Sequence, residues 1–154
     1  MCSSDLLNFS KSARVAHVFM NLNELKRLVA KGESDRVEFK KTTGQRTEAA
    51  KTVCAMLNGL GGFVVFGVGN KGELIGQDIG QRTVAEVTHE LARIEPPAFP
   101  EIETIAFKEG RSFIVLRVPG GGGLFSFDGR YYQSVGPTTR QMAQDEQQDR
   151  KSVV

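Results

Sequence analysis

Acidic and basic side chains stand beside apolar ones in the segment GESDRVEFKKTTGQR, residues 32–46. Glu38 and Lys40 are two residues apart, so in a strand their side chains lie on the same face. Residues five apart on a regular strand face opposite ways, so Glu33 must sit in the preceding turn to meet Glu38. Two interpretations fit this pattern: a solvated edge strand, or a nucleic-acid site with acidic residues at its centre.

Basic residues continue beyond this segment. Between positions 21 and 51, eight lysines and arginines stand against five acidic residues, although the formal net charge of the whole chain is only +2. The first third of the chain is therefore locally basic. Lys40, Lys41, Arg46 and Lys51 form a cluster placed to follow a phosphate backbone, through contacts that are salt-dependent and independent of sequence.

A second group of candidate contacts lies near the C-terminus, in GRYYQSVGPTTR. Arg130 and Tyr131 put a cation beside an aromatic ring that can stack on bases, and the same pair also fits simple packing on a sheet. Arg140 and the two preceding threonines are further candidates for phosphate contacts. The threonines also suit a second role, which is to cap a last helix.

Composition narrows the class of protein. A chain of 154 residues with 40% hydrophobic residues is expected to form one domain. Cys2 and Cys54 do not make a disulfide framework, and Cys54 falls on an apolar helical stripe that predicts a buried free thiol. His17 and His89 lie far apart with no cysteine nearby, which argues against zinc. No apolar run approaches a membrane span and no signal-peptide core precedes the domain, so we expect a cytoplasmic protein.

Two glycine patterns resemble nucleotide-binding motifs without the required context. GVGNKG, residues 67–72, follows a predicted strand, but a dinucleotide fingerprint needs a helix next and ELIG reads as strand. NGLGG, residues 58–62, lacks the Lys-Ser/Thr of a P-loop. We therefore expect a hairpin turn and a helix stop at these positions, and no nucleotide cofactor.

Hydrophobic periodicity predicts an α+β domain with a mixed β-sheet, hairpins, and helices packed on the sheet faces. Helices are expected from residue 22 to a stop at Gly32, over 47–58, and over 84–94. Strands are expected over 37–40, 61–68, 73–76, 101–107, 112–118 and, as the last strand, 131–135. The expected boundaries are a flexible N-terminal arm over residues 1–20, the domain over 21–142, and a polar, weakly helical tail over 143–154.

Four motifs occur in a particular order: ESDRVEFK at 33–40, AMLNGLGGFVVFGVGNKGELIG at 55–76, EPPAFPEIE at 95–103, and GRYYQSVGPTTR at 129–140. Together they resemble the Schlafen AlbA-like domain, over roughly residues 21–142. In bacteria this family is described as a DNA-binding or divergent ATPase-type regulatory domain. The resemblance implies a nucleic-acid-binding domain of a transcriptional or defence regulator. Some animal members are metal-dependent endoribonucleases that cut structured RNA such as tRNA.

The resemblance also implies roles for particular residues. In the nuclease members, two glutamates of the first motif and an aspartate after the central strand hold a divalent cation, Mg²⁺ or Mn²⁺. The matching residues here are Glu33, Glu38 and Asn70, and Lys40 is placed to steady the phosphate. Asn70 departs from the family pattern, because an amide carbonyl can bind a metal but brings no charge. Glu73 is a candidate substitute if the following hairpin brings it round.

Two functions remain open: a nucleic-acid-binding module that tolerates loss of the third acid, and a metal-dependent endoribonuclease with a modified triad. Asn70 favours the first. In the animal relatives two AlbA-like lobes form a clamp around the nucleic acid, whereas this chain holds one lobe. We therefore expect a homodimer in which residues 36–51 of both copies face a shared groove, since two-fold pairing is the common way to close such an assembly.

Overall fold

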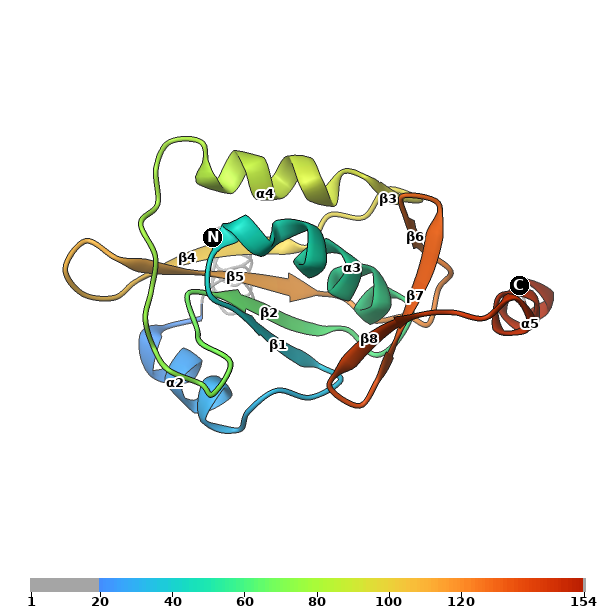
Figure 1. Ribbon diagram of the computed structural model, residues 1–154, viewed down its shortest axis with the longest axis horizontal. Helices are drawn as coiled ribbons and strands as arrows, with labels where there is room; N and C mark the ends of the chain where they lie inside the picture. The colour runs from blue at the N-terminus through green and yellow to red at the C-terminus, as the bar shows by residue number, and fades with distance from the viewer. Residues whose placement is uncertain (1–19, 154) are drawn as a thin grey trace, which may run out of the picture.

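The computed structural model describes residues 20–153 (Figure 1). The expected N-terminal arm over residues 1–20, with Cys2 and His17, lies outside this range except for Met20. The helices are α2 (Leu22–Ala30), α3 (Arg46–Leu57), α4 (Thr83–Leu91) and α5 (Gln144–Val153), with a short 3₁₀ turn, η1 (Thr43–Gln45), before α3.

The strands form two four-stranded sheets. The first sheet has the order β1 (Val37–Lys40), β2 (Gly62–Phe66), β5 (Ser112–Val118), β4 (Glu101–Ala106). Its β1–β2 pair is parallel and the other pairs are antiparallel, so this sheet is mixed. The second sheet has the order β3 (Ile94–Glu95), β6 (Ser126–Phe127), β7 (Arg130–Val135), β8 (Thr138–Gln141) and is antiparallel. The chain has the α+β fold that the sequence predicts.

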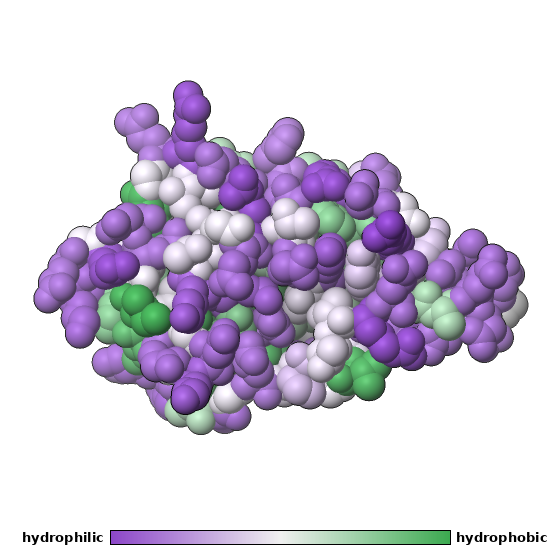
Figure 2. Space-filling model, in the orientation of Figure 1, coloured by the Kyte–Doolittle hydropathy of each residue, from purple (hydrophilic) through white to green (hydrophobic). Residues whose placement is uncertain are grey.

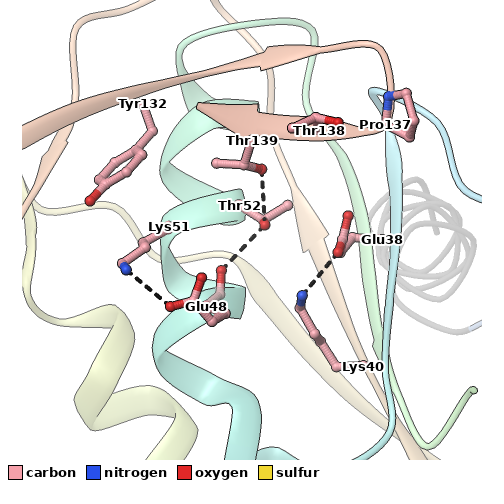
Figure 3. A pocket seen from close by; sticks show the side chains of 9 residues that line it. All are labelled: Glu38, Lys40, Glu48, Lys51, Thr52, Tyr132, Pro137, Thr138 and Thr139. Carbon is pink, nitrogen blue, oxygen red and sulfur yellow. Dashed lines mark hydrogen bonds and ion pairs between the residues drawn. The ribbon is translucent and has the colours of Figure 1, made fainter. Parts of the chain in front are cut away.

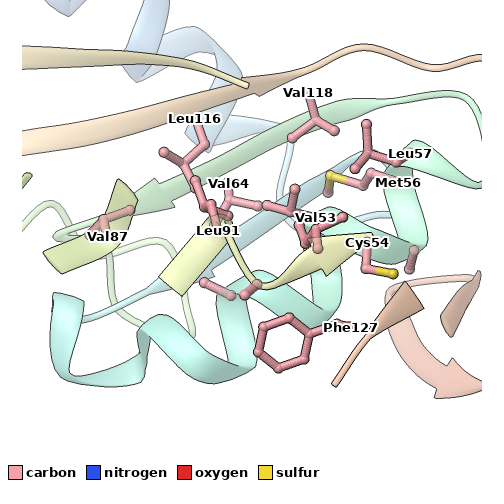
Figure 4. Close-up of a cluster of buried hydrophobic side chains, with 14 of the residues drawn as sticks. Val53, Cys54, Met56, Leu57, Val64, Val87, Leu91, Leu116, Val118 and Phe127 are labelled. Atoms are coloured by element: carbon pink, nitrogen blue, oxygen red, sulfur yellow. The ribbon is translucent and has the colours of Figure 1, made fainter. Parts of the chain in front are cut away.

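The first sheet separates two apolar cores. The α2 core contains Leu25, Val29, Val37, Phe39, Val65, Val68, Ile105, Phe113 and Val115. The larger core lies between the first sheet, α3, α4 and the second sheet, and includes Val53, Val64, Val87, Leu91, Leu116 and Phe127 (Figure 4). Cys54 is fully buried in this core, and burial raises the pKa of its thiol to about 11. The predicted buried free thiol is confirmed.

Strand alternation decides which way the β1 side chains face. Val37 and Phe39 are buried in the α2 core. Because successive side chains of a strand point to opposite faces, Glu38 and Lys40 face the α3 side. The same four-residue strand therefore fills one core and presents an acid–base pair on the other face of the sheet.

A buried asparagine joins the second sheet to the end of α3. The Asn58 side-chain amide donates to the carbonyl oxygens of Phe125 and Tyr132 at 2.9 Å each, and its oxygen accepts from the Phe125 N–H. Arg150 of α5 donates to the Asn58 carbonyl oxygen at 2.6 Å. Asn58 is 1% exposed, so these bonds form away from solvent and fix β7 against α3.

Most predicted elements are confirmed. The side chain of Asn21 accepts from the Glu24 N–H at 2.8 Å and begins α2, and Gly32, with φ of +80°, follows its end. The predicted 101–118 hairpin forms between β4 and β5. No helix follows the GVGNKG stretch at 67–72, in agreement with the expected turn.

Three expectations about the elements are wrong. Residues 73–76 form only an isolated bridge, Leu74 to Val68, because the positive φ angles of Gly67 and Gly76 bend the chain away from an extended ladder. The third helix ends at Leu91, and Ile94 pairs in β3 instead.

The third correction concerns residues after Val135, which was expected to end the last strand. The chain returns as β8, where Thr138 and Thr139 pair with Val135 and Ser134, so these threonines do not cap a helix. A polar edge strand has one side open to solvent and carries little hydrophobic pattern, which hid it in the sequence. The tail that follows is the helix α5.

Candidate nucleic-acid interface

A groove of about 390 Å³ opens between β1, α3 and the β7–β8 hairpin (Figure 3). We call it the lysine groove. Its lining residues are Glu38, Lys40, Glu48, Lys51, Thr52, Tyr132, Pro137, Thr138 and Thr139. Two ammonium groups, two carboxylates and several hydroxyls therefore face one space.

On the β1 side the groove holds a preformed ion pair. Lys40 Nζ lies 2.9 Å from Glu38 Oε1, and the two side chains are only 14% and 16% exposed. Burial raises the pKa of the Glu38 carboxyl, the hydrogen bond and charge of Lys40 lower it, and the charge of Glu33 raises it. Because burial and the Glu33 charge outweigh Lys40, the pKa of Glu38 stays above its ordinary value.

Glu33 lies outside β1, before the turn that leads into the strand. A side chain there can approach Glu38, whereas residues five apart on one regular strand face opposite ways. Glu33 Oε1 accepts from the Phe39 N–H at 2.9 Å. Phe39 follows Glu38 directly in β1, so this hydrogen bond holds the Glu33 carboxylate beside the part of the strand that carries Glu38. The structure thus brings together two of the residues that the resemblance assigns to a metal.

Asn70 is placed differently. It is exposed in the turn between Gly69 and Glu73, and Gly72 of that turn lies beside Val29 on the α2 side of the sheet. Glu73 does not replace it, because its carboxylate folds back over Gly69 and accepts from the Lys71 N–H. Within residues 20–153 there is no group of three or more His, Cys, Asp or Glu residues that could hold a metal ion.

On the α3 side, Lys51 Nζ lies 3.0 Å from Glu48 Oε1, one helical turn away. The hydrogen bond from Lys51 to Glu48 raises the pKa of Lys51, with a smaller contribution from Tyr132, while the charge of Arg130 lowers it. Arg130 itself does not line the groove. Lys51 is the more exposed of the two groove lysines, at 30%.

The other predicted contact residues lie outside the groove lining. Lys41 is exposed at the end of β1, and Arg46 lines a different groove, between α3 and α4, with Arg82 and His89. Arg140 pairs with Glu146 of α5 at 2.7 Å.

Tyr131, the predicted stacking residue, is half-buried. Lys151 Nζ lies 5.8 Å from the centre of its ring. The four residues of the predicted basic cluster are thus split: Lys40 and Lys51 line the lysine groove, whereas Lys41 and Arg46 do not.

Thr138 and Thr139, candidate phosphate contacts from the sequence, line the groove, whereas Glu48 and Thr52 were missed. Thr52 Oγ1 of α3 and Thr139 Oγ1 of β8 are 3.1 Å apart and join the two walls. Glu48 lies three residues before Lys51, and Thr52 lies four residues after Glu48, so helical spacing could have found both, since residues three and four apart share a face. The approach of β8 to α3 has no local signal, because it depends on how the second sheet packs.

A family model described as "Schlafen, AlbA_2" matches residues 33–143. This match spans most of the chain, and the chain belongs to the Schlafen AlbA_2 family. No curated protein matches the sequence.

Among solved structures, the fold is similar to that of the DIP2311 protein from Corynebacterium diphtheriae, with a TM-score of 0.57 and 18% sequence identity. The match covers 76% of this chain and 24% of that one, so this chain spans about a quarter of that protein. A second similar structure is the N-terminal domain of a RecG-related protein from Nitrosomonas europaea, with a TM-score of 0.48, 20% identity, and coverage of 82% and 96%.

No helix within residues 20–153 has the length and apolar character needed to cross a membrane.

Proposed function

We propose that this chain is a nucleic-acid-binding domain that contacts the phosphate backbone through the lysine groove. The observation that carries the proposal is the convergence of Lys40 from β1 and Lys51 from α3 on one groove lined with hydroxyls (Figure 3). Ammonium groups and hydroxyls are the donors that proteins present to phosphate oxygens. Membership in the Schlafen AlbA_2 family supports the same function.

The two ion pairs set the strength of such binding. The Lys51–Glu48 pair is solvent-exposed and worth little in isolation, so a phosphate can take over Lys51 at small cost. The Lys40–Glu38 pair is more buried, and the Glu38 carboxylate opposes an incoming phosphate while it stays charged. The groove is therefore suited to moderate, salt-sensitive binding rather than to tight capture of free anions.

Assembly completes the proposal. Within residues 20–153, β4 has a strand neighbour on one side only, and its other edge is the place where we propose that a second copy pairs. Two copies would double the phosphate contacts along one ligand, with residues 36–51 of each facing a shared groove. The biological role that fits this domain best is that of a transcriptional or defence regulator in the cytoplasm.

Binding can be measured by fluorescence anisotropy with labelled duplex DNA and labelled tRNA over a series of salt concentrations. The Lys40→Gln/Lys51→Gln double variant removes both groove charges, and the matched control, Lys26→Gln/Lys71→Gln, removes two exposed lysines outside the groove lining. We expect the double variant to lose affinity and the control to retain it. Equal affinity of the wild type and the double variant would exclude the groove as the binding surface.

A metal-dependent endoribonuclease acting on structured RNA is the second candidate function, with Glu33, Glu38 and Lys40 as its candidate catalytic residues. The position of the Glu33 carboxylate favours it, because Glu33 Oε1 accepts from the N–H of Phe39, the residue next to Glu38. The donor set fits Mg²⁺ or Mn²⁺ poorly, because no third acidic residue joins the two glutamates within residues 20–153 and Asn70 would bring no charge. Incubation of the labelled tRNA with Mn²⁺ and with EDTA tests this function separately, since cleavage that requires Mn²⁺ would establish it.

A further inference from the structure

The tip of the β7–β8 hairpin carries apolar residues that the fold does not bury. Val135 is 50% exposed, and Pro137 follows it in the exposed turn. Only three other large apolar side chains in the described residues are classed as exposed: Leu60, Ile75 and Phe99. In Figure 2 a green patch lies at the lower right, where Figure 1 shows the end of the β7–β8 hairpin, and another lies at the left of the same, largely polar face.

The tip is a tight turn on a braced hairpin. Val135 pairs with Thr138, which leaves Gly136 and Pro137 as the turn. Gly136 has a φ of +58°, and a glycine at the first central position is typical of the type II′ turn. Behind the tip, Thr139 is bonded to Thr52 of α3, and the Tyr132 carbonyl oxygen is held by Asn58. The apolar tip therefore projects from a base that is fixed to the body of the domain.

The tip also borders the lysine groove. Pro137 and Thr138 line the groove together with Lys40. A phosphate held by Lys40 would consequently lie next to the hairpin tip, with the bases of the same strand within reach of Val135 and Pro137. A protruding apolar side chain beside phosphate-binding lysines has a recognised use, which is to enter between stacked bases and kink the duplex.

We propose that the β7–β8 tip acts as a wedge, with Val135 and Pro137 entering between adjacent base pairs of duplex DNA from the minor groove, while Lys40 and Lys51 hold the flanking phosphate. This inference rests on the proposed nucleic-acid function and specifies its mode of binding. A wedge of this kind favours flexible pyrimidine–purine steps, which unstack most easily. The domain would then select sites by deformability without reading base edges.

The variant that tests the wedge is Val135→Thr/Pro137→Ser. Threonine keeps the shape and β-branching of valine, so β7 is retained, while the tip becomes polar. Phe99→Ser is the matched control, because it removes an exposed apolar side chain that lines a separate cavity with Arg117 and Pro119. Thermal unfolding of all three proteins establishes that each is folded before binding is compared.

The ligand is a set of short DNA duplexes in which 2-aminopurine replaces each adenine in turn, with a donor and an acceptor dye at the two ends. Wild type and Phe99→Ser are expected to raise 2-aminopurine emission at flexible steps and to shorten the end-to-end distance. The tip variant should lose both signals at saturating protein, while it keeps the salt dependence of binding.

Four outcomes would overturn the wedge. A tip variant that still unstacks and bends the duplex shows that these side chains do not insert. Binding by the wild type without either signal removes the wedge and leaves the proposed function intact. Absence of any binding by the wild type removes the proposed function, and the wedge with it. A wild type that associates with itself through the tip, and loses this association in the tip variant, would assign the apolar tip to a protein contact instead.

Discussion

Lys40 is bonded to Glu38 two residues earlier on the same strand, with 2.9 Å between Nζ and Oε1 and both side chains largely buried. A strand places such residues side by side, and the wall formed by β8 and α3 shields the pair from water. The central cation of the proposed interface is therefore already occupied by an internal anion. Any phosphate that binds Lys40 must replace or tolerate the Glu38 carboxylate.

Glu38→Gln should increase affinity for nucleic acid. Glutamine keeps the shape of the side chain but no longer repels phosphate or holds Lys40 by charge. A gain of about 1 kcal/mol, a few-fold lower Kd, corresponds to one charge-assisted hydrogen bond released for the ligand. Anisotropy at fixed salt measures it, with Glu95→Gln, an exposed glutamate of β3, as the control. If the chain is instead a nuclease, the same variant should abolish cleavage, so the two functions give opposite results.

The salt dependence of affinity should show how many groove lysines contact phosphate. Each lost phosphate contact lowers the slope of log affinity against log salt by about one unit, so Lys40→Gln/Lys51→Gln should lower it by about two. Lys41→Gln/Arg46→Gln removes the same charge outside the groove lining. A steeper loss of slope in this second variant would move the interface to the α3–α4 side, where Arg46 lies with Arg82.

Affinity should also rise as the pH falls, because burial keeps the pKa of Glu38 above its ordinary value of 4.5. Protonation of Glu38 releases Lys40, so binding tightens as the pH decreases from neutral through the raised pKa. The same shift has a consequence for stability: the folded chain holds this proton more firmly than the unfolded chain, so the contribution of Glu38 to stability is full below 4.5 and is lost as the pH rises through the folded pKa. Anisotropy titrations from neutral pH downward test the binding effect. The Glu38→Gln variant should lack this component, and an identical pH profile in both proteins would contradict the assignment.

Local patterns in the sequence predicted the elements that depend on local physics. The Gly32 stop and the alternation around Glu38 are short-range features, and the structure has them as expected. The β8 strand was missed because a polar edge strand has no hydrophobic signature. Its pairing with β7 places Thr139 against Thr52, and this contact between residues far apart in the chain closes the groove.

The predicted basic cluster illustrates the same limit within a helix. Lys51 and Arg46 are near in sequence, but five helical residues turn them to different sides of α3, so one lines the lysine groove and the other the α3–α4 groove. The helical period could have separated them. The period alone does not predict which side of α3 faces β8, because that depends on tertiary packing.

Asn58→Ala should destabilise the domain strongly. The substitution leaves the Phe125 and Tyr132 carbonyl oxygens and the Phe125 N–H without their side-chain partner in a buried site. Loss of such a network costs about 2–4 kcal/mol. Urea denaturation measures the free energy of unfolding, with Asn70→Ala in the exposed turn expected to change it by less than about 0.5 kcal/mol. Similar values for the two variants would contradict the role of Asn58 in joining the second sheet to α3.

The last prediction concerns the edge of β4 that pairs with no other strand within residues 20–153. If two copies pair through this edge, light scattering should give a mass near twice the 16.9 kDa of one chain. Ala106 is an exposed residue at the end of β4, and Ala106→Lys places a charge there, which is how natural edge strands avoid pairing. The variant should be a folded monomer that binds duplex DNA more weakly than the wild type, since it loses half of the phosphate contacts along one ligand. Glu109→Gln, in the β4–β5 turn, raises the net charge by the same one unit beyond the strand and should leave the dimer intact. A wild type that remains monomeric both free and bound to a long duplex would rule out the paired arrangement, and so would a dimer whose interface buries Lys40 and Lys41.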